Sequence, residues 1–442
     1  MLLGPLLVLA IGAAAAAADP QAKYRPLPSL REQDALERSW VKARHAFVPS
    51  VLKKHGYDAW LLSMREYGED PAFRALVPTT TVFSSRRRTT LLFHTDASLP
   101  NPITWIDNTP GVWSNLNATL YALDPARIAV NIDQHVAFAD GLSAGERDAL
   151  HANLDARYAV RLEPSREIPV EVVAARVGGA AQLAEYRRLQ ENVWAMVAEG
   201  FSSHRVRVGE TTPADLEWWF RDRMQNLGVT TWFQPSVSII RKDGTGDVVS
   251  PGDVLHVDIG ITAMGMNTDT QHLGYVLRAN ETAPPAGLVQ GLHNANRLQD
   301  FVREEMVPGR TGDEVFFATK KRMADAGLNG TIYSHPIGDY GHSAGAIIGM
   351  SDIQGAVPHL GSNKVLENYW TSVELAGETY VPEWGRVVKF PLEEDVYWNA
   401  DTRTFEFVFG QQTQFHLVQP ARGGLGYLAA KLGVAALWSQ AK

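Results

Sequence analysis

The feature that most constrains this chain is a pair of aspartates on two consecutive apolar segments. Residues 253–277 read DVLHVDIGITAMGMNTDTQHLGYVL, which predicts two strands joined by a tight turn at AMGM, where Gly265 lies. If Thr262 pairs with Gly265, Asp258 lies directly opposite Asp269, and both carboxylates share one face of the sheet. Two like charges so close are destabilising unless one carboxyl is protonated or a cation lies between them.

Two more acidic side chains fall on apolar segments further along the chain. Glu374 lies between Val373 and Leu375 in WTSVELAG, and an apolar strand rarely carries a charge without a partner. Glu394 lies among three consecutive acids in FPLEEDVYW, where a solvated turn is the alternative interpretation. Four carboxylates and a neutral imidazole from His342 carry a formal charge of −4, which two divalent cations would cancel. Such ligands suit Mn²⁺, and Co²⁺ or Zn²⁺ less strongly.

The chain resembles the pita-bread metallopeptidases, a family that includes methionine aminopeptidase, Xaa-Pro aminopeptidase and prolidase. The resemblance rests on the order and spacing of Asp258, Asp269, His342, Glu374 and Glu394. It implies that Asp258 binds one metal ion and that His342 with Glu374 binds the other. It also implies that Asp269 and Glu394 bridge both ions. Glu374 would in addition be the proton shuttle for the attacking hydroxide.

The chain departs from the family pattern around its histidines. His335, in SHPIG, resembles a family histidine that steadies the tetrahedral intermediate, with a hydrogen-bonded structural histidine as the alternative. The family spacing H-x-x-G-H requires a three-residue insertion before His342, because Asp339 would otherwise fall on the ligand position. The usual D-x-T-R is replaced by DTQH at 269–272, and two further family histidines have no counterpart in IIRKDGTGDVV and GMSDIQG. We therefore expect intact metal chemistry and an altered substrate-positioning set.

The segment GHSAG, at 341–345, also matches the nucleophile elbow G-x-S-x-G of serine esterases, in which Ser343 would attack. An elbow follows a buried strand, whereas the preceding TIYSHPIGDY is interrupted by a proline and a glycine. Asp395 and His416 would supply the remaining acid and histidine. We favour His342 as a metal ligand over this esterase. A non-catalytic protein or a metal-free creatinase-like amidinohydrolase on the same fold is a further alternative.

The whole chain predicts two domains after a leader. Residues 1–18 are apolar and end in alanines, which is typical of a cleaved signal peptide, with a retained membrane anchor as the alternative. Residues 25–170 resemble the α/β N-terminal domain of creatinase and prolidase, and 175–442 predict an α+β pita-bread catalytic domain with a C-terminal tail. Within the first domain, TTTVFSS (79–85) is predicted as a strand, and EPSREIPVE (163–171) as the linker to the second.

The second domain contains two similar halves. VGETTPADLEWWFRDRMQNLG (208–228) and PGRTGDEVFFATKKRMADAG (308–327) each place Gly-x-Thr before a predicted helix that closes with a glycine. Two such halves offer a cleft between them, where ligand sites tend to lie. The tail segment GYLAAKLGVAALW (426–438) is expected to dock on the body or on a second subunit.

The amino-acid composition limits the classes of partner and of metal site that this protein can have. The net charge of −8 and the absence of a basic stretch argue against nucleic acid, and the lack of cysteine excludes disulfides and thiolate metal sites. We expect an exported, periplasmic or secreted peptidase that acts on peptides, forms a homo-oligomer such as a dimer, and is not inserted in a membrane after signal cleavage. Its expected reaction is dinuclear metal-dependent hydrolysis of N-terminal peptide bonds or dipeptides, preferring Xaa-Pro bonds, whose tertiary amide lacks an N–H.

Overall fold

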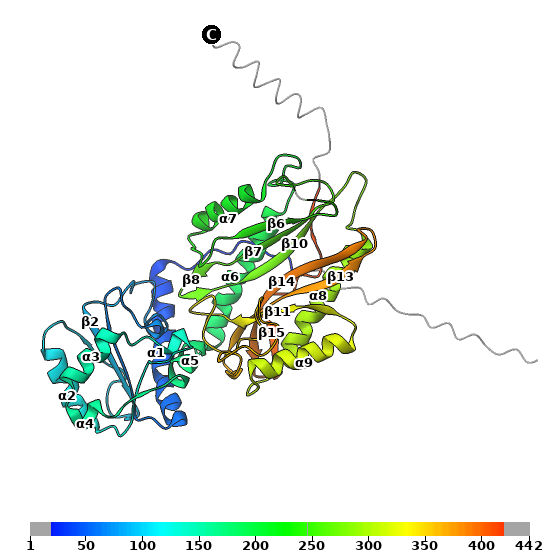
Figure 1. Ribbon diagram of the computed structural model, residues 1–442. Coiled ribbons are helices and arrows are strands. Elements are labelled where there is room, and N and C mark those ends of the chain that lie inside the picture. The colour runs from blue at the N-terminus through cyan, green and yellow to red at the C-terminus, as the bar shows by residue number, and fades with distance from the viewer. Residues whose placement is uncertain (1–18, 245, 420–442) are drawn as a thin grey trace, which may run out of the picture.

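The computed structural model describes residues 19–244 and 246–419, which form two sheets with their own helices (Figure 1). The predicted leader at 1–18 and the tail segment at 426–438, which is expected to dock, lie outside the described residues. Within the described residues, no helix combines the length and apolar character that a membrane span requires.

The first sheet lies between α1 on one side and α2, α3 and α4 on the other (Figure 1). Its strand order is β3-β2-β1-β4-β5, with β1 and β4 parallel and β1 and β2 antiparallel. The strands are β1 (Ala59–Arg65), β2 (Arg88–His94), β3 (Ile103–Ile106), β4 (Ile128–Val130) and β5 (Leu162–Pro164). The helices are α1 (Leu30–His55), α2 (Gly111–Leu123), α3 (Ala144–Asn153), α4 (Ala156–Ala159) and α5 (Glu167–Ala174), with 3-10 turns at Pro71–Leu76 and Ala137–Ala139.

Two predictions for this region are wrong. Residues 79–85 form turns instead of a strand, because Thr80 bonds the Glu37 carboxylate of α1 through both its backbone N–H and its hydroxyl, at 2.9 and 2.7 Å. Such side-chain bonds compete with a strand ladder. Residues 163–171 contain the end of β5 and the start of α5 instead of a linker. Helix α5 forms because its apolar side chains, including Ile168 and Val172, are fully buried against α1 and its surroundings.

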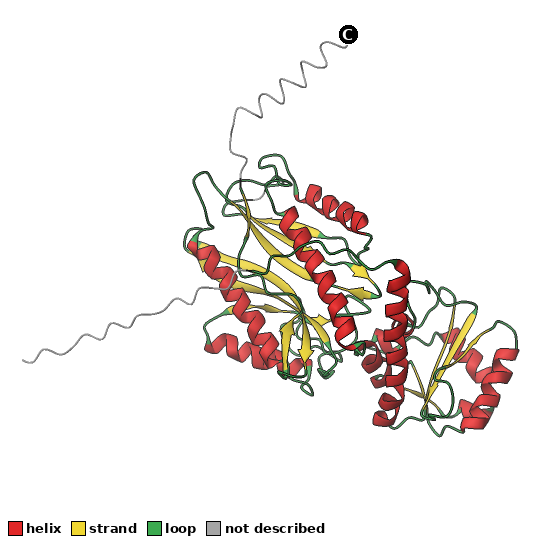
Figure 2. Cartoon of the chain, turned by 180° about the vertical axis from the view of Figure 1, so that it is seen from behind, coloured by secondary structure: helices red, strands yellow, loops and turns green. Residues whose placement is uncertain are grey.

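The second sheet carries long helices across one side (Figure 2). Its order is β11-β13-β14-β10-β7-β6, with β12 on β13, β15 on β14 and β16 on β10. The strands are β6 (Ser236–Ile240), β7 (Val254–Ile259), β10 (Thr270–Val276), β11 (Asn329–Ile332), β12 (His335–Pro336), β13 (Trp370–Val381), β14 (Arg386–Asn399), β15 (Thr404–Phe407) and β16 (His416–Val418); β8 (Thr262–Ala263) and β9 (Met266–Asn267) pair separately. The helices are α6 (Gly179–Gly200), α7 (Pro213–Leu227), α8 (Ala286–Glu305) and α9 (Gly312–Asp325).

The similar segments of the two halves are the starts of α7 and α9. Thr212 and Thr311 cap these helices in the same way, each in a capping box with the acidic residue three positions later. Helix α8 covers the face of β13 and β14 that carries Val373 and Leu375, with which its own apolar side chains form one core. The opposite face of these strands is therefore the one left for a site.

The hairpin that carries the two aspartates turns one residue later than predicted. The turn falls on Met264 and Gly265, both with positive φ (52° and 67°), as a two-residue hairpin turn with matching twist requires. Asp258 is therefore paired with Gln271, not with Asp269. Because this change moves the pairing by two residues, Asp258 and Asp269 still share one face.

Candidate metal centre

A row of polar side chains crosses the second sheet from β7 to β13. Gln271 of β10 lies between Asp258 of β7 and Glu393 of β14, its register partners on either side. Glu393 is in turn the register partner of Glu374 in β13. Because directly paired residues share a face, this row brings three carboxylates and one amide side by side.

Two further residues complete the cluster: His335 of β12, and Asp269, which lies two residues before Gln271. Nε2 of His335 lies 3.6 Å from Oδ2 of Asp269, 3.4 Å from Oε1 of Glu393 and 3.8 Å from Oε2 of Glu374. Ligand atoms of Asp269, His335 and Glu393 all lie within 4.8 Å of one another, and the three side chains are buried. Nδ1 of His335 bonds the Pro336 carbonyl at 3.0 Å, so Nδ1 carries the proton and Nε2 is directed at the carboxylates.

The pKa values of the cluster residues indicate that the buried carboxylates are stabilised by a bound proton or another cation. Burial, with the charge of Glu393, raises the pKa of Asp258 to about 8. Burial and neighbouring carboxylates also raise the pKa values of Asp269 and Glu374 well above their usual range. Burial alone would lower the pKa of His335, but the carboxylates of Glu393, 3.4 Å from its Nε2, and of Glu374 raise it to about 9. The cluster thus takes up protons when no other cation is present.

These residues fit divalent metal ions. Among the described residues, Oδ1 of Asp258 and Nε2 of His335 are buried without a hydrogen-bond partner. Buried polar atoms of this kind are normally satisfied, and both are atoms that bind metal ions. The donor set is rich in carboxylate and has one imidazole: Asp258, Asp269, His335, Glu374 and Glu393.

The structure brings His335, not His342, to the carboxylates. The His342 ring lies beside that of His335, with centroids 4.6 Å apart and planes at 89°, and it is exposed. Asp339, the residue an ungapped reading places at the ligand position, is buried against Arg44 and Arg176 at 3.0 and 2.5 Å. No insertion before His342 is therefore needed to supply a histidine to the cluster.

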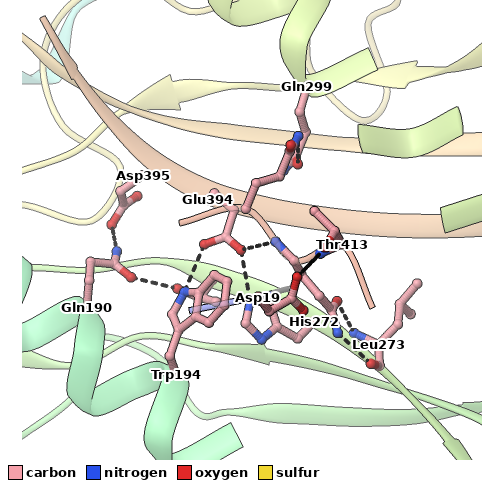
Figure 3. A network of polar contacts seen from close by, with 12 residues as sticks. Asp19, Gln190, Trp194, His272, Leu273, Gln299, Glu394, Asp395 and Thr413 are labelled. Carbon is pink, nitrogen blue, oxygen red and sulfur yellow. Dashed lines mark hydrogen bonds and ion pairs between the residues drawn. The ribbon is translucent and has the colours of Figure 1, made fainter. Parts of the chain in front are cut away.

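The structure places Glu394 on the helix-covered face of the sheet, beside Trp194 of α6 and His272 of β10 (Figure 3). Its carboxylate accepts hydrogen bonds from Nε1 of Trp194 at 3.1 Å and from the Gln412 backbone at 3.2 Å, and it contacts Nε2 of His272 at 2.8 Å. The reason is strand alternation: Glu393 shares the face of Glu374, so the next residue points the other way. Glu393 thus lies where the sequence pattern suggested Glu394.

The GHSAG segment packs tightly and lacks the contacts of a nucleophile elbow. Ser343 is buried, and its hydroxyl has no hydrogen-bond partner among the described residues, so none of them holds a general base against it. A Cβ at Gly341 would overlap the indole of Trp232, and one at Gly345, where φ is 138°, would overlap the Tyr369 ring. Close packing therefore accounts for the two glycines of the motif.

Comparisons with known proteins agree with this geometry. Residues 184–397 match the model of metallopeptidase family M24. A comparison with curated proteins gives no match. The fold is similar to X-Pro aminopeptidase from Thermotoga maritima MSB8 (TM-score 0.56, 15% identity, 85% of this chain and 99% of that one). It is also similar to Xaa-Pro dipeptidase from Bacillus anthracis (0.57, 14%, 85% and 99%) and to aminopeptidase P from E. coli (0.53, 15%, 84% and 94%).

These solved structures extend over both sheets of the chain and, at such low identity, report on the fold alone. The family match extends from within α6 to near the end of β14 and includes every residue of the cluster. The chain therefore has the two-domain pita-bread fold, and its residues 184–397 match the model of metallopeptidase family M24.

Proposed function

We propose that this protein is a dinuclear metal-dependent peptidase that hydrolyses the N-terminal peptide bond of peptides, or dipeptides, with a preference for Xaa-Pro bonds. The observation that carries the proposal is the buried group of Asp269, His335 and Glu393, whose ligand atoms lie within 4.8 Å of one another inside an M24 domain. The prolyl preference draws on the names of the similar solved structures, an X-Pro aminopeptidase and an Xaa-Pro dipeptidase.

Two divalent ions, with Mn²⁺ as the first candidate, would be held by the donor set named above. When bound, such ions polarise the scissile carbonyl and lower the pKa of the attacking water. The closeness of Glu374 and Glu393 then becomes favourable, because each carboxylate compensates positive charge.

Two side chains take part in the chemistry, and of these only Glu374 also belongs to the donor set. Glu374 takes the proton of the attacking water and passes it to the leaving amine, a role for which a carboxyl with a raised pKa suits neutral pH. His342 replaces His335 as the residue that steadies the tetrahedral intermediate. Although part of the His342 ring is exposed to solvent, the protein atoms packed around the rest of it, together with the neighbouring His335, lower its pKa to about 4, so the ring is neutral and offers one N–H donor.

A substrate panel tests the reaction. Xaa-Pro dipeptides, Xaa-Pro-Yaa tripeptides and matched Xaa-Ala peptides are assayed with Mn²⁺, with Co²⁺ and with a chelator. We expect cleavage of the prolyl substrates that is lost with chelator and restored by metal. Unchanged turnover after complete chelation would refute the mechanism, and equal turnover of the Xaa-Ala series would refute the prolyl preference.

Metal analysis separates the peptidase from the other reading of the fold, a non-catalytic or creatinase-like protein. We expect two divalent ions per chain after equilibration with Mn²⁺, and fewer than two would favour that alternative.

We further propose export through the leader at 1–18 and assembly as a homodimer. Cell fractionation tests the export, and sedimentation of the purified protein tests the assembly.

A further inference from the structure

The side chain of Gln271 contacts both carboxylates of the Glu374–Glu393 pair. Its Nε2 group donates to Oε1 of Glu374 and, at 2.9 Å, to Oε2 of Glu393. Its Oε1 atom contacts Nε2 of His256 at 2.9 Å. Gln271 is 3% exposed, so water does not compete for these bonds.

The contacts fix which way the amide points. An amide nitrogen has two N–H groups, and here each reaches a different carboxylate. The reversed amide would set its oxygen against two carboxylates. Because the amide oxygen only accepts, Nε2 of His256 must carry the proton, which leaves Nδ1 to accept from the Ser238 hydroxyl at 3.3 Å. His256 therefore fixes the amide through its oxygen atom, while the amide nitrogen bonds the two carboxylates.

The bonds divide the oxygens of each carboxylate. Gln271 holds Oε1 of Glu374 and Oε2 of Glu393. The other oxygen of each, Oε2 of Glu374 and Oε1 of Glu393, is the one that lies nearest Nε2 of His335, at 3.8 and 3.4 Å. One oxygen of each carboxylate is thus bonded to Gln271, and the second oxygen faces His335. The second oxygen of Glu393 also accepts a hydrogen bond from the Ser372 hydroxyl at 2.6 Å.

We propose that Gln271, supported by His256, is a positioning residue that sets the orientation of Glu374 and Glu393 toward the metal centre. The inference rests on the proposed function, since it assumes that these carboxylates bind ions. Gln271 is the third residue of DTQH at 269–272, where the sequence departs from D-x-T-R. Groups that orient metal ligands typically change metal affinity 10–100-fold when removed.

The test measures Co²⁺ binding by calorimetry and by the visible absorption of the bound ion, with no substrate present. Gln271→Met keeps the length of the side chain and removes its hydrogen bonds. We expect about 10–100-fold weaker Co²⁺ binding and a shifted absorption band, because Glu374 and Glu393 each lose the hydrogen bond from Gln271 and Glu393 keeps only that from Ser372. His256→Phe, which touches neither carboxylate, is expected to act in the same direction with a smaller loss. Gln182→Leu, at another buried glutamine on α6, is the matched control and should change neither readout.

The outcomes separate this inference from the proposed function. A wild-type protein that binds no Co²⁺ or Mn²⁺ would overturn the metal centre itself. A wild-type protein that binds Co²⁺, together with a folded Gln271→Met variant of unchanged affinity and spectrum, would overturn only the role of Gln271. If Gln271→Met does not fold, the His256→Phe variant decides between the outcomes. An unchanged Co²⁺ affinity and spectrum in that variant would show that the hydrogen bond from His256 to the Gln271 amide does not affect the metal centre, and would refute the proposal.

Discussion

Arg44 of α1 and Asp339 of the loop between β12 and β13 form a buried ion pair of 3.0 Å that joins the N-terminal domain to the domain of the metal centre. Asp339 forms a second ion pair with Arg176, at 2.5 Å. Both arginines also donate to backbone carbonyls, Arg44 to Ala75 and, at 3.0 Å, to Ala175, and Arg176 to Val173, whereas the Nε atom of each has no hydrogen-bond partner among the described residues. The loop that follows His335 in β12 and carries His342 is thus held in place from the first domain.

Replacing Asp339 by Asn should destabilise the protein strongly. The change leaves two buried guanidinium groups without a counter-charge, and breaking a buried pair in this way costs about 3–5 kcal/mol. Urea unfolding measures the loss. Asp325→Asn, in the exposed pair with Lys321 at 2.6 Å, is the control and should cost under about 0.5 kcal/mol. A difference between the two variants below about 1 kcal/mol would show that the interdomain pair contributes little.

Glu393 and Glu394 should behave differently although they are neighbours. Glu393→Gln removes a carboxylate from the cluster and should lower Mn²⁺ binding and peptidase turnover at least about 100-fold. Glu394→Gln lies on the other face and should keep the metal content while destabilising the network with Trp194 and His272 by about 1–3 kcal/mol. Metal analysis and thermal unfolding of both variants check this, and the reverse pattern of metal loss would mean that the face assignment is incorrect.

The metal-free protein should lose stability as pH rises. The pKa of Asp258 is raised to about 8, mainly by burial, whereas an unfolded aspartate titrates near 4. The folded state therefore binds more protons between about pH 4 and pH 8, and its unfolding free energy falls across that window. The expected fall from pH 5 to pH 8 is on the order of 2–4 kcal/mol, since one pKa unit corresponds to about 1.4 kcal/mol.

Unfolding of chelated protein at pH 5, 6.5 and 8 measures this trend. With saturating Mn²⁺ the trend should reverse, because the ion binds the deprotonated carboxylates. Asp258→Asn should reduce the slope of the metal-free protein. A metal-free protein that gains stability toward pH 8 would contradict the raised pKa values.

The sequence predicts that acidic side chains gather on one sheet face, and the structure shows why it does not identify each member. An error of two residues in the hairpin register preserved the shared face of Asp258 and Asp269, since side chains alternate with a period of two. In the run of Glu393, Glu394 and Asp395, alternation separates the middle acid from the outer two, but either parity satisfies the sequence pattern. Only the pairing with Glu374 fixes it.

The histidines illustrate a different limit. A family spacing applied to HPIGDYGH favoured His342, and the deciding fact is tertiary: Asp339, four residues after His335, is held by arginines from outside the loop. The helices after Gly-x-Thr were easier to predict, because the capping boxes at Thr212 and Thr311 that begin α7 and α9 are local to the sequence. The strand predicted at 79–85 was lost to hydrogen bonds with Glu37 of α1, a contact between residues far apart in sequence.

Ser343→Ala tests the remaining esterase interpretation of GHSAG. In a metal-dependent peptidase the hydroxyl takes no part in the chemistry, so the variant should keep at least about half of the wild-type turnover on prolyl peptides and its full dependence on Mn²⁺. The substitution removes one buried hydroxyl that has no hydrogen-bond partner among the described residues, so stability should change by less than about 1 kcal/mol. Turnover of prolyl peptides and of a p-nitrophenyl ester is measured for wild type and variant, with and without chelator. A serine esterase predicts the opposite pattern: ester turnover that resists the chelator and falls by several orders of magnitude in the variant.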